Sequence, residues 1–497
     1  MRKNVLVSGL LILSIGLASL GAAGTLASEV ESTAPTRIIA SALGPSPLEE
    51  NLRQLTDEVG GRMSGSPSMR RAVAWAMEAF RQAGVDDVHT ETFSMPVGWS
   101  EGDTRLEILE PVAFQPGVVS LGWSPPADLE ASVVLVGQGT DADFAGVGTQ
   151  ARGAILLVES DLLNTWEDLF GEYMRAPGII DRALDAGAKA ILWMSTRKHR
   201  LLYRHQNVIT GDVDQIPQGL IAREDAQRIA RLLRSRQAVR ARLTMPNRIS
   251  GPLEEENIVA EIRGREKPEE IVVLGAHLDS WDLGTGALDD GCNSALVIDV
   301  ARALRAAGRP PRRTVRFVLF SGEEQGMHGS RAYVQAHPEE MDNTVAAVIY
   351  DAGIGRVTGY SLGGRKDVEA AVREILQPVE SWGANEHTTD AGVGTDNLDF
   401  LLEGIPTLVA NQEPANYMVN YHAASDTFDK VDIRDLKLHT ALAAVTVWGI
   451  AERPERLGER QSRQEIEVLM RETGLDRQLK LFELWEQWER GERGRQP

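Results

Sequence analysis

Residues 271–307 read IVVLGAHLDSWDLGTGALDDGCNSALVIDVARALRAA, and this stretch decides the fold. It opens with a continuous apolar run over 271–276, passes through a polar loop, and becomes helical in pattern from about 293 to 307. An unbroken apolar run of this length is typical of a strand that is covered on both faces. The stretch therefore predicts a strand, a loop and a helix, in that order.

The same unit recurs further along the chain. A second apolar strand is predicted over 314–320, with a helix near 329–336, and a third strand over 345–350. Continuous apolar strands that alternate with helices indicate the α/β class. We expect a mostly parallel mixed sheet that is flanked by helices.

The chain has 497 residues, which is more than one compact domain normally holds. Helices between 47 and 82 and a strand near 88–93 open an α/β domain, whereas 104–245 carries short strands, Gly-rich turns and a helix near 179–186. That middle region lacks clustered metal-type residues, so it is interpreted as an inserted domain. The predicted parts are a signal peptide (1–27), the first part of the α/β domain (28–103), an inserted domain (104–250), the main part of that α/β domain (251–451) and a charged helical tail (452–497).

Acidic and imidazole side chains collect where the predicted strands end. In open α/β sheets, functional groups gather beyond the carboxyl ends of the strands. The residues of this kind are His277, Asp279, Asp289, Glu323, Glu324, Asp351 and His422. Imidazole nitrogens and carboxylate oxygens that converge on one sheet edge suit zinc.

Each of these residues alone also has an ordinary structural role open to it. A pair of glutamates on a loop is usually solvated, an aspartate after a strand is often a helix cap, and a single histidine is often structural. Their joint occurrence at successive strand ends favours a metal site. Two catalytic zinc ions need about three protein ligands each, and one bridging carboxylate reduces the requirement to five residues. That number is supplied by His277, Asp289, Glu324, Asp351 and His422, which leaves Glu323 as a free base.

Three motifs resemble the co-catalytic zinc aminopeptidase and glutamate carboxypeptidase family. They are HLDSWD with GALDDG (277–282 and 286–291), SGEEQG (321–326) and YHAASDT (421–427). The Trp-containing loop is closest to the plasma glutamate carboxypeptidase branch, and the resemblance runs from about residue 47 to 450. The inserted region is similar to a protease-associated domain, which this family often carries.

The resemblance also implies roles for single residues. One zinc would be bound by His277 and Asp351, the other by Glu324 and His422, and Asp289 would bridge them. Asp279 would accept a hydrogen bond from the His277 ring and fix its tautomer. The family further suggests a cis peptide bond between Asp289 and Asp290.

Composition narrows the partners and the location. The net charge of −20 repels nucleic-acid phosphates and anionic membrane surfaces, so both are set aside. Residues 1–27 combine a basic start, a short apolar run and small residues, which predicts an export signal and a secreted or periplasmic protein, with an uncleaved anchor helix as the alternative. The single cysteine, Cys292, is assigned to packing in the core. Whether the chain forms a homodimer is left open by the sequence.

The sequence thus predicts a di-zinc exopeptidase in which two zinc ions activate water and Glu323 acts as general base. The expected substrates are dipeptides or short peptides, and the resemblance favours dipeptides with free termini. Aminopeptidase and carboxypeptidase specificities are not separated by the residues. A non-catalytic binding homologue and a glutaminyl cyclase with one zinc are the competing interpretations, and cobalt or manganese stays an alternative metal.

Overall fold

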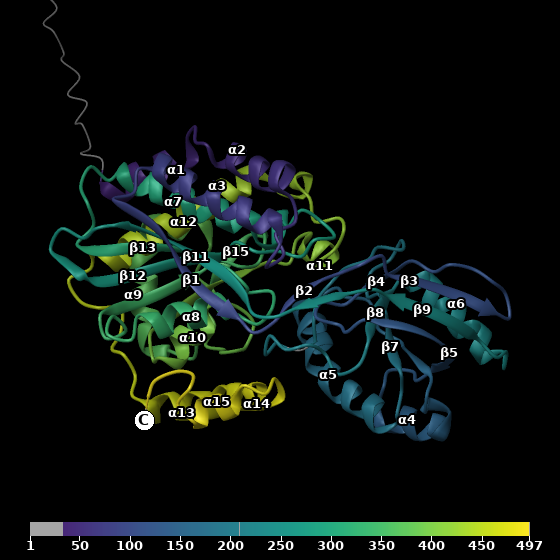
Figure 1. Cartoon of the computed structure of the whole chain (residues 1–497). Coiled ribbons are helices and arrows are strands. Elements are labelled where there is room, and N and C mark those ends of the chain that lie inside the picture. The colour runs from purple at the N-terminus through teal and green to yellow at the C-terminus, as the bar shows by residue number, and fades with distance from the viewer. Residues whose placement is uncertain (1–32, 208, 497) are drawn as a thin grey trace, which may run out of the picture.

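The computed structural model describes residues 33–207 and 209–496 of the chain. The predicted export signal over 1–27 lies outside these residues. Within the described ranges, no helix combines the length and the apolar character that crossing a membrane requires. The chain forms two seven-stranded sheets, one in each half of the molecule (Figure 1).

The first sheet carries the strands that the apolar runs predict. Its order is β1 (Asp87–Met95), β11 (Leu253–Ile262), β13 (Arg313–Phe320), β12 (Lys267–His277), β14 (Thr344–Ile349), β16 (Thr407–Gln412) and β15 (Val357–Ser361). The four inner strands from β13 to β16 are parallel, and each strand outside them pairs antiparallel with its neighbour. The expected mixed sheet flanked by helices is confirmed.

Helices cover both faces of this sheet (Figure 1). One face packs against α1 (Ala34–Leu43), α2 (Leu48–Arg53), α3 (Pro67–Ala83), α7 (Cys292–Arg305), α9 (Glu369–Ile375) and α12 (Ile433–Glu452). The other face packs against α8 (His328–Ala336) and α10 (Asn397–Leu402) through Tyr333, Val334 and Phe400. The helix predicted over 293–307 is α7, whose apolar residues lie in the core together with Cys292.

A second sheet unit, defined here as residues 98–250, lies between β1 and β11. It begins and ends in a two-stranded ribbon of β2 (Gly98–Ser100) and β10 (Arg248–Ser250). Its sheet has the order β3 (Arg105–Glu110), β9 (Arg240–Met245), β5 (Ala127–Leu135), β6 (Ile155–Val158), β7 (Ala190–Met194), β8 (Gln218–Ile221) and β4 (Val118–Ser120). Its helices are α4 (Asp141–Val147), α5 (Trp166–Asp185) and α6 (Arg223–Arg234).

Helix α5 differs from its prediction. The sequence predicts a helix near 179–186 only, whereas α5 starts at Trp166 and continues through Pro177. A capping box of Thr165 and Asp168 begins the helix, because each side chain pairs with the backbone N–H of the other. Because proline usually ends a helix, the sequence pattern does not predict the half of α5 that precedes Pro177.

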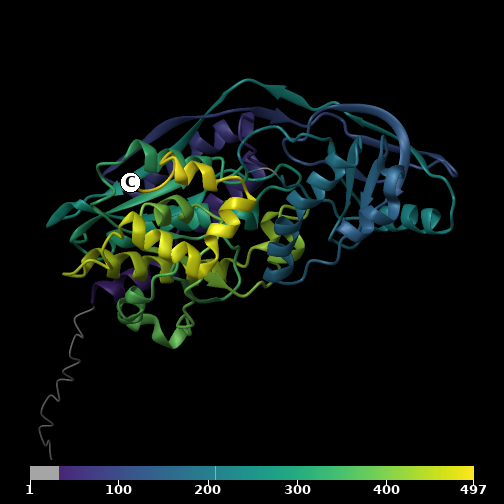
Figure 2. The same ribbon diagram turned by 90° about the horizontal axis from the view of Figure 1, so that it is seen from below.

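The chain ends in three short helices, α13 (Arg463–Thr473), α14 (Leu475–Leu481) and α15 (Trp485–Glu489). We refer to residues 463–496 as the C-terminal segment. It lies on the α8 and α10 side of the first sheet, away from the purple N-terminal helices (Figures 1 and 2). Its buried residues, among them Ile466, Leu479 and Trp488, form a core with Leu398 and Leu402 of α10.

Candidate metal centre

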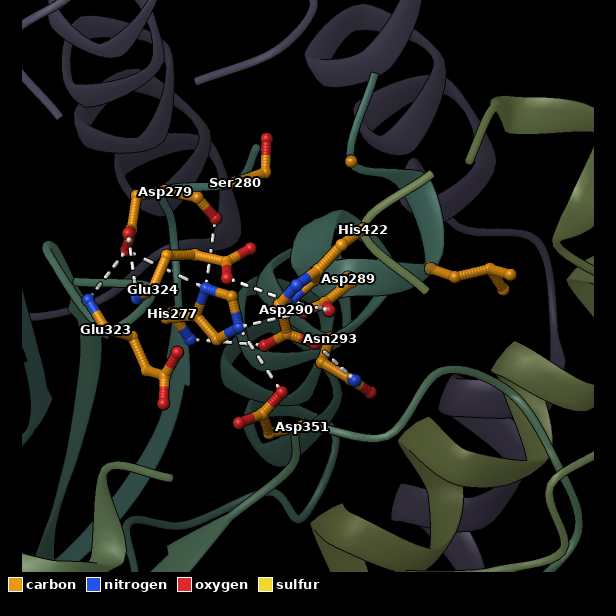
Figure 3. A network of polar contacts seen from close by, with 12 residues as sticks. His277, Asp279, Ser280, Asp289, Asp290, Asn293, Glu323, Glu324, Asp351 and His422 are labelled. Carbon is orange, nitrogen blue, oxygen red and sulfur yellow. Dashed lines mark hydrogen bonds and ion pairs between the residues drawn. The ribbon is translucent and has the colours of Figure 1, made fainter. Parts of the chain in front are cut away.

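The candidate centre lies at the carboxyl ends of the parallel strands (Figure 3). His277 is the last residue of β12, Glu323 and Glu324 follow β13, and Asp351 follows β14. Asp289 lies in a short turn, Ala287–Gly291, between β12 and α7. His422 comes from the loop after α11 (Tyr417–Asn420) and has a positive φ of 57°.

The Asp289 carboxylate lies between the two histidine rings. Its Oδ1 is 3.1 Å from His277 Nε2, and its Oδ2 is 3.1 Å from His422 Nε2. His277 Nε2 is also 3.3 Å from Asp351 Oδ1, and His422 Nε2 is 2.9 Å from Glu324 Oε2. The five residues therefore form two groups of ligand-type atoms that share one carboxylate.

The spacing of these atoms fits a pair of metal ions. A tetrahedral zinc ion with bonds of about 2.0–2.2 Å holds its ligand atoms about 3.3 Å apart, close to the observed N···O distances. Asp289 Oδ2, Glu324 Oε1 and His422 Nδ1 are buried without a hydrogen-bond partner. Buried polar atoms of this kind are rare unless they bind an ion or water. The donor set and its unsatisfied atoms thus fit metal binding.

The charges of the site also favour the binding of cations. Burial lowers the pKa of both rings, but the neighbouring carboxylates outweigh it, so that the pKa of His422 is raised to about 9 and that of His277 well above its ordinary value. Burial raises the pKa of Glu324 to about 7. Protons and divalent ions therefore compete for the same atoms.

Asp279 accepts a hydrogen bond from the His277 ring, as the resemblance implies, but it does so through its backbone. The His277 Nδ1–H donates to the Asp279 backbone carbonyl at 3.0 Å, whereas the Asp279 carboxylate is 3.7 Å from Nδ1, too far for a hydrogen bond. The carboxylate accepts the backbone N–H groups of Glu323 and Glu324 instead, each at 3.2 Å. Asp279 therefore fixes the imidazole tautomer through its backbone and holds the glutamate loop through its side chain.

Asp290 supports the same site from beside Asp289. The peptide bond between Asp289 and Asp290 is cis, as the resemblance suggests. Asp290 Oδ2 accepts the His277 backbone N–H at 3.1 Å, and Oδ1 accepts Asn293 Nδ2 at 2.6 Å. Both oxygens of Asp290 are therefore engaged, although it groups with His277 and Asp351 by distance.

Two buried residues that sequence reasoning does not single out support the turn that carries Asp289. The Asp426 carboxylate accepts the backbone N–H groups of Ala287, Leu288 and Asp289 at 2.7–3.1 Å. Arg62 is fully buried and donates to backbone carbonyls between β12 and α7, at residues 278, 285 and 286. Asp426 stands in the third motif, and its position there was the available signal. Arg62 lies more than 200 residues away and carries no local signal.

The second sheet unit supports the loop that carries His422. The Arg204 backbone N–H donates to the His422 carbonyl at 3.0 Å, and Tyr203 forms a bridge with Ala423. The Arg204 side chain is 1% exposed and pairs with Glu101 and Asp282. Residues of the second unit thus help to position a candidate metal ligand.

A cavity of about 350 Å³ opens beside the metal-type residues. Asp289, Glu323, Glu324, Asp351 and His422 line it on the polar side. Burial, together with the carboxylates of Asp351 and Asp396, raises the pKa of Glu323 well above its usual range. Gly394 also lines the cavity. The cavity therefore gives a substrate access to the carboxylate cluster.

Comparison with known proteins agrees with this geometry. The sequence profile of peptidase family M28 matches residues 257–447. Human carboxypeptidase Q is 30% identical over 417 residues, covering 82% of this chain and 86% of the human protein. Carboxypeptidase Q of Xenopus laevis is 28% identical over 415 residues, with the same coverage.

Solved structures give the same fold. The peptidase M28 precursor from Shewanella amazonensis SB2B has a TM-score of 0.79 and 27% identity, over 86% of this chain and 98% of that one. A zinc aminopeptidase from Bacillus subtilis has a TM-score of 0.64 at 19% identity, over 84% of this chain and 97% of its own. The chain is a metallopeptidase and belongs to peptidase family M28.

Proposed function

We propose that the chain is a di-zinc exopeptidase that hydrolyses dipeptides or short peptides. One observation carries this proposal: the two oxygens of Asp289 each lie 3.1 Å from the Nε2 of a different histidine. A single carboxylate placed in this way suits a bridge between two ions. His277 and Asp351 would complete one site, and Glu324 and His422 the other. When bound, two zinc ions would supply the Lewis acidity that activates water and polarises a peptide carbonyl.

Glu323 is proposed as the general base. It lines the cavity next to Glu324, but it belongs to neither group of candidate ligands. Its carboxylate is therefore available to take a proton from the attacking water and to return it to the leaving amine. Asp279 would hold Glu323 in place through the backbone N–H that it accepts.

The relatives support peptide substrates. The curated relatives are carboxypeptidases by name, and the Bacillus subtilis neighbour is a zinc aminopeptidase. These names support zinc as the metal and the release of terminal residues as the reaction. Attack from the amino end and attack from the carboxyl end both stay compatible with the site.

Two further proposals concern the rest of the chain. Residues 104–250 are proposed as an inserted domain of the protease-associated kind, supported by their own seven-stranded sheet and by the ribbon that joins them to the first sheet. Export is proposed from the basic and apolar pattern of residues 1–27, followed by secretion or release into a periplasm.

The test is a metal titration coupled to a substrate screen. Protein stripped by a chelator is reloaded with zinc, metal per chain is measured by mass spectrometry, and dipeptides with N-blocked and C-blocked analogues are assayed. We expect two zinc ions per chain and hydrolysis that stops on chelation and returns with zinc. One ion per chain would favour a cyclase and none a binding protein. Hydrolysis that is insensitive to chelation would overturn the mechanism.

A further inference from the structure

The cavity beside the metal-type residues has an apolar side that comes from distant parts of the chain. Helix α5 contributes Trp166, Leu169, Phe170 and Tyr173. These positions follow the i, i+3, i+4, i+7 spacing of one helix face. The other apolar residues of the lining include Met327, Val393 and, from the C-terminal segment, Phe482.

The two halves of helix α5 lie in different environments. Ile179, Ile180 and Ala183 in the second half are buried in the core of the second sheet unit. In the first half, Trp166 and Phe170 are 36% and 43% exposed, although both are large and apolar. The first half of α5 therefore presents apolar surface to the cavity rather than to its own core.

This half of α5 is fixed against the metal site. Tyr173 Oη lies 2.9 Å from the hydroxyl of Tyr421, the residue before His422. Trp166 Nε1 donates to the Gln412 carbonyl at 3.2 Å, and its ring lies 5.5 Å from that of Tyr417. These contacts make the apolar face of α5 a fixed wall of the cavity.

The C-terminal segment is also fixed in place. Arg493 and Asp399 form a buried ion pair with two N···O distances of 2.7 Å, and both side chains are at most 3% exposed. Gln478 Oε1 accepts the backbone N–H of Val393 at 2.9 Å. The segment therefore holds the loop at 393 and 394 and also places Phe482 at the cavity.

From this arrangement we infer that Phe482 and the α5 face form a binding subsite for an apolar side chain of the substrate. The subsite is continuous with the cavity that contains Glu323 and His422, so a peptide at the metal centre reaches it. The inference rests on the proposed function. The match to the family profile ends at residue 447, so Phe482 belongs to a part of the chain outside that match.

In an apolar pocket of this kind, each methylene-sized difference between two substrate side chains changes kcat/KM by roughly 10-fold to 200-fold. We expect substrates with leucine or phenylalanine to exceed those with alanine by at least about tenfold in kcat/KM. The preferred position follows from comparing Leu-Gly and Phe-Gly with Gly-Leu and Gly-Phe, each against its alanine counterpart.

The test uses Phe170→Ala and Phe482→Ala, with Trp485→Ala as a matched control. Trp485 is an aromatic residue of the same segment that packs on the same core but does not line the cavity. Phe170 is partly exposed, so its truncation leaves the folded core intact. We expect both phenylalanine variants to lose about tenfold of the preference for large apolar side chains, measured as the ratio of kcat/KM for the phenylalanine substrate to that for its alanine counterpart. Trp485→Ala should keep the preference of the wild type.

A second measurement separates this inference from the proposed function. Calorimetry follows binding of a Phe-Gly analogue with a reduced peptide bond, and of its alanine counterpart, to zinc-loaded protein. The subsite is supported if both variants bind the phenylalanine analogue more weakly than the wild type does, while binding of the alanine analogue is unchanged. This outcome supports the subsite even if the wild type hydrolyses no peptide. The inference would be overturned if Phe170→Ala kept the preference for phenylalanine over alanine, or if Trp485→Ala lost as much of that preference as the two phenylalanine variants. It would also be overturned if the wild type did not bind the phenylalanine analogue.

Discussion

At the scale of single residues, Glu323 and Glu324 are neighbours in sequence with different proposed tasks. Glu324 Oε2 lies 2.9 Å from the His422 ring, whereas Glu323 lies outside both groups of candidate ligands. We expect Glu323→Gln to retain its zinc and to lose about 100-fold to 10,000-fold in kcat, because the amide cannot accept the proton. Metal analysis and steady-state kinetics check this.

The matched control is Glu324→Gln, which removes a proposed ligand. This variant should bind zinc more weakly, and Glu323→Gln should not. Near-normal turnover in Glu323→Gln would refute the assignment of the base.

The buried carboxyl of Asp214, in the second sheet unit, gives a prediction about how the stability of the chain depends on pH. Burial raises the pKa of Asp214 to about 8, and its Oδ1 has no hydrogen-bond partner. The folded chain keeps a proton there that the unfolded chain releases near its ordinary pKa of about 3.8, so the stabilisation that this proton gives is complete below pH 4 and is lost as pH rises towards 8. We expect Asp214→Asn to exceed the wild type in free energy of unfolding by more than about 1 kcal/mol at pH 8.

Urea unfolding at several pH values measures this difference. The advantage of Asp214→Asn should shrink as pH falls towards 4. Asp212→Asn, a substitution of an exposed neighbour, serves as the control and should follow the wild type. An advantage of Asp214→Asn that is the same at pH 4 and pH 8 would contradict the prediction.

At the scale of elements, a loop of the second sheet unit contacts the backbone of His422, a proposed metal ligand. Arg204 is buried, and its guanidinium joins Glu101, Asp282 and the Ser120 carbonyl. Removing one partner of a buried ion pair costs about 3–5 kcal/mol. We expect Arg204→Met to lose stability of this order and to weaken zinc binding by about 10-fold to 100-fold, as changes around a metal ligand do.

Denaturant unfolding and competition with a chromophoric chelator measure the two effects. Arg200→Met in the same loop is the control, because the Arg200 side chain is half exposed and pairs with Asp225 of the second sheet unit. This variant should keep the zinc affinity of the wild type. Equal zinc affinity in the Arg204 variant and the wild type would show that the loop does not position His422.

The elements also show how far the sequence alone leads. Three of the four inner strands, β12, β13 and β14, are predictable because unbroken apolar runs such as 271–276, bounded by polar loops, are typical of strands covered on both faces, and the ends of these strands lead to candidate ligands. The fourth inner strand, β16, is not among the predicted strands. The edge strand β15 is not predictable in this way, because Val357–Ser361 is short and polar in part. The contributions of Arg62, Arg204 and Phe482 arise only from contacts between distant segments, and no local pattern encodes such contacts.

At the scale of the whole molecule, the position of the second sheet unit has a consequence for how the chain folds. β1 pairs with β11, with Met95 opposite Leu253, so this pairing closes a loop of roughly 150 residues, and the entropic cost of closure rises with the logarithm of loop length. Once β2 has paired with β10, only residues 96–97 and 251–252 separate the ribbon from the two strands. A second unit that folds early therefore brings β1 and β11 together and lowers the entropic cost of closing this loop in the first sheet.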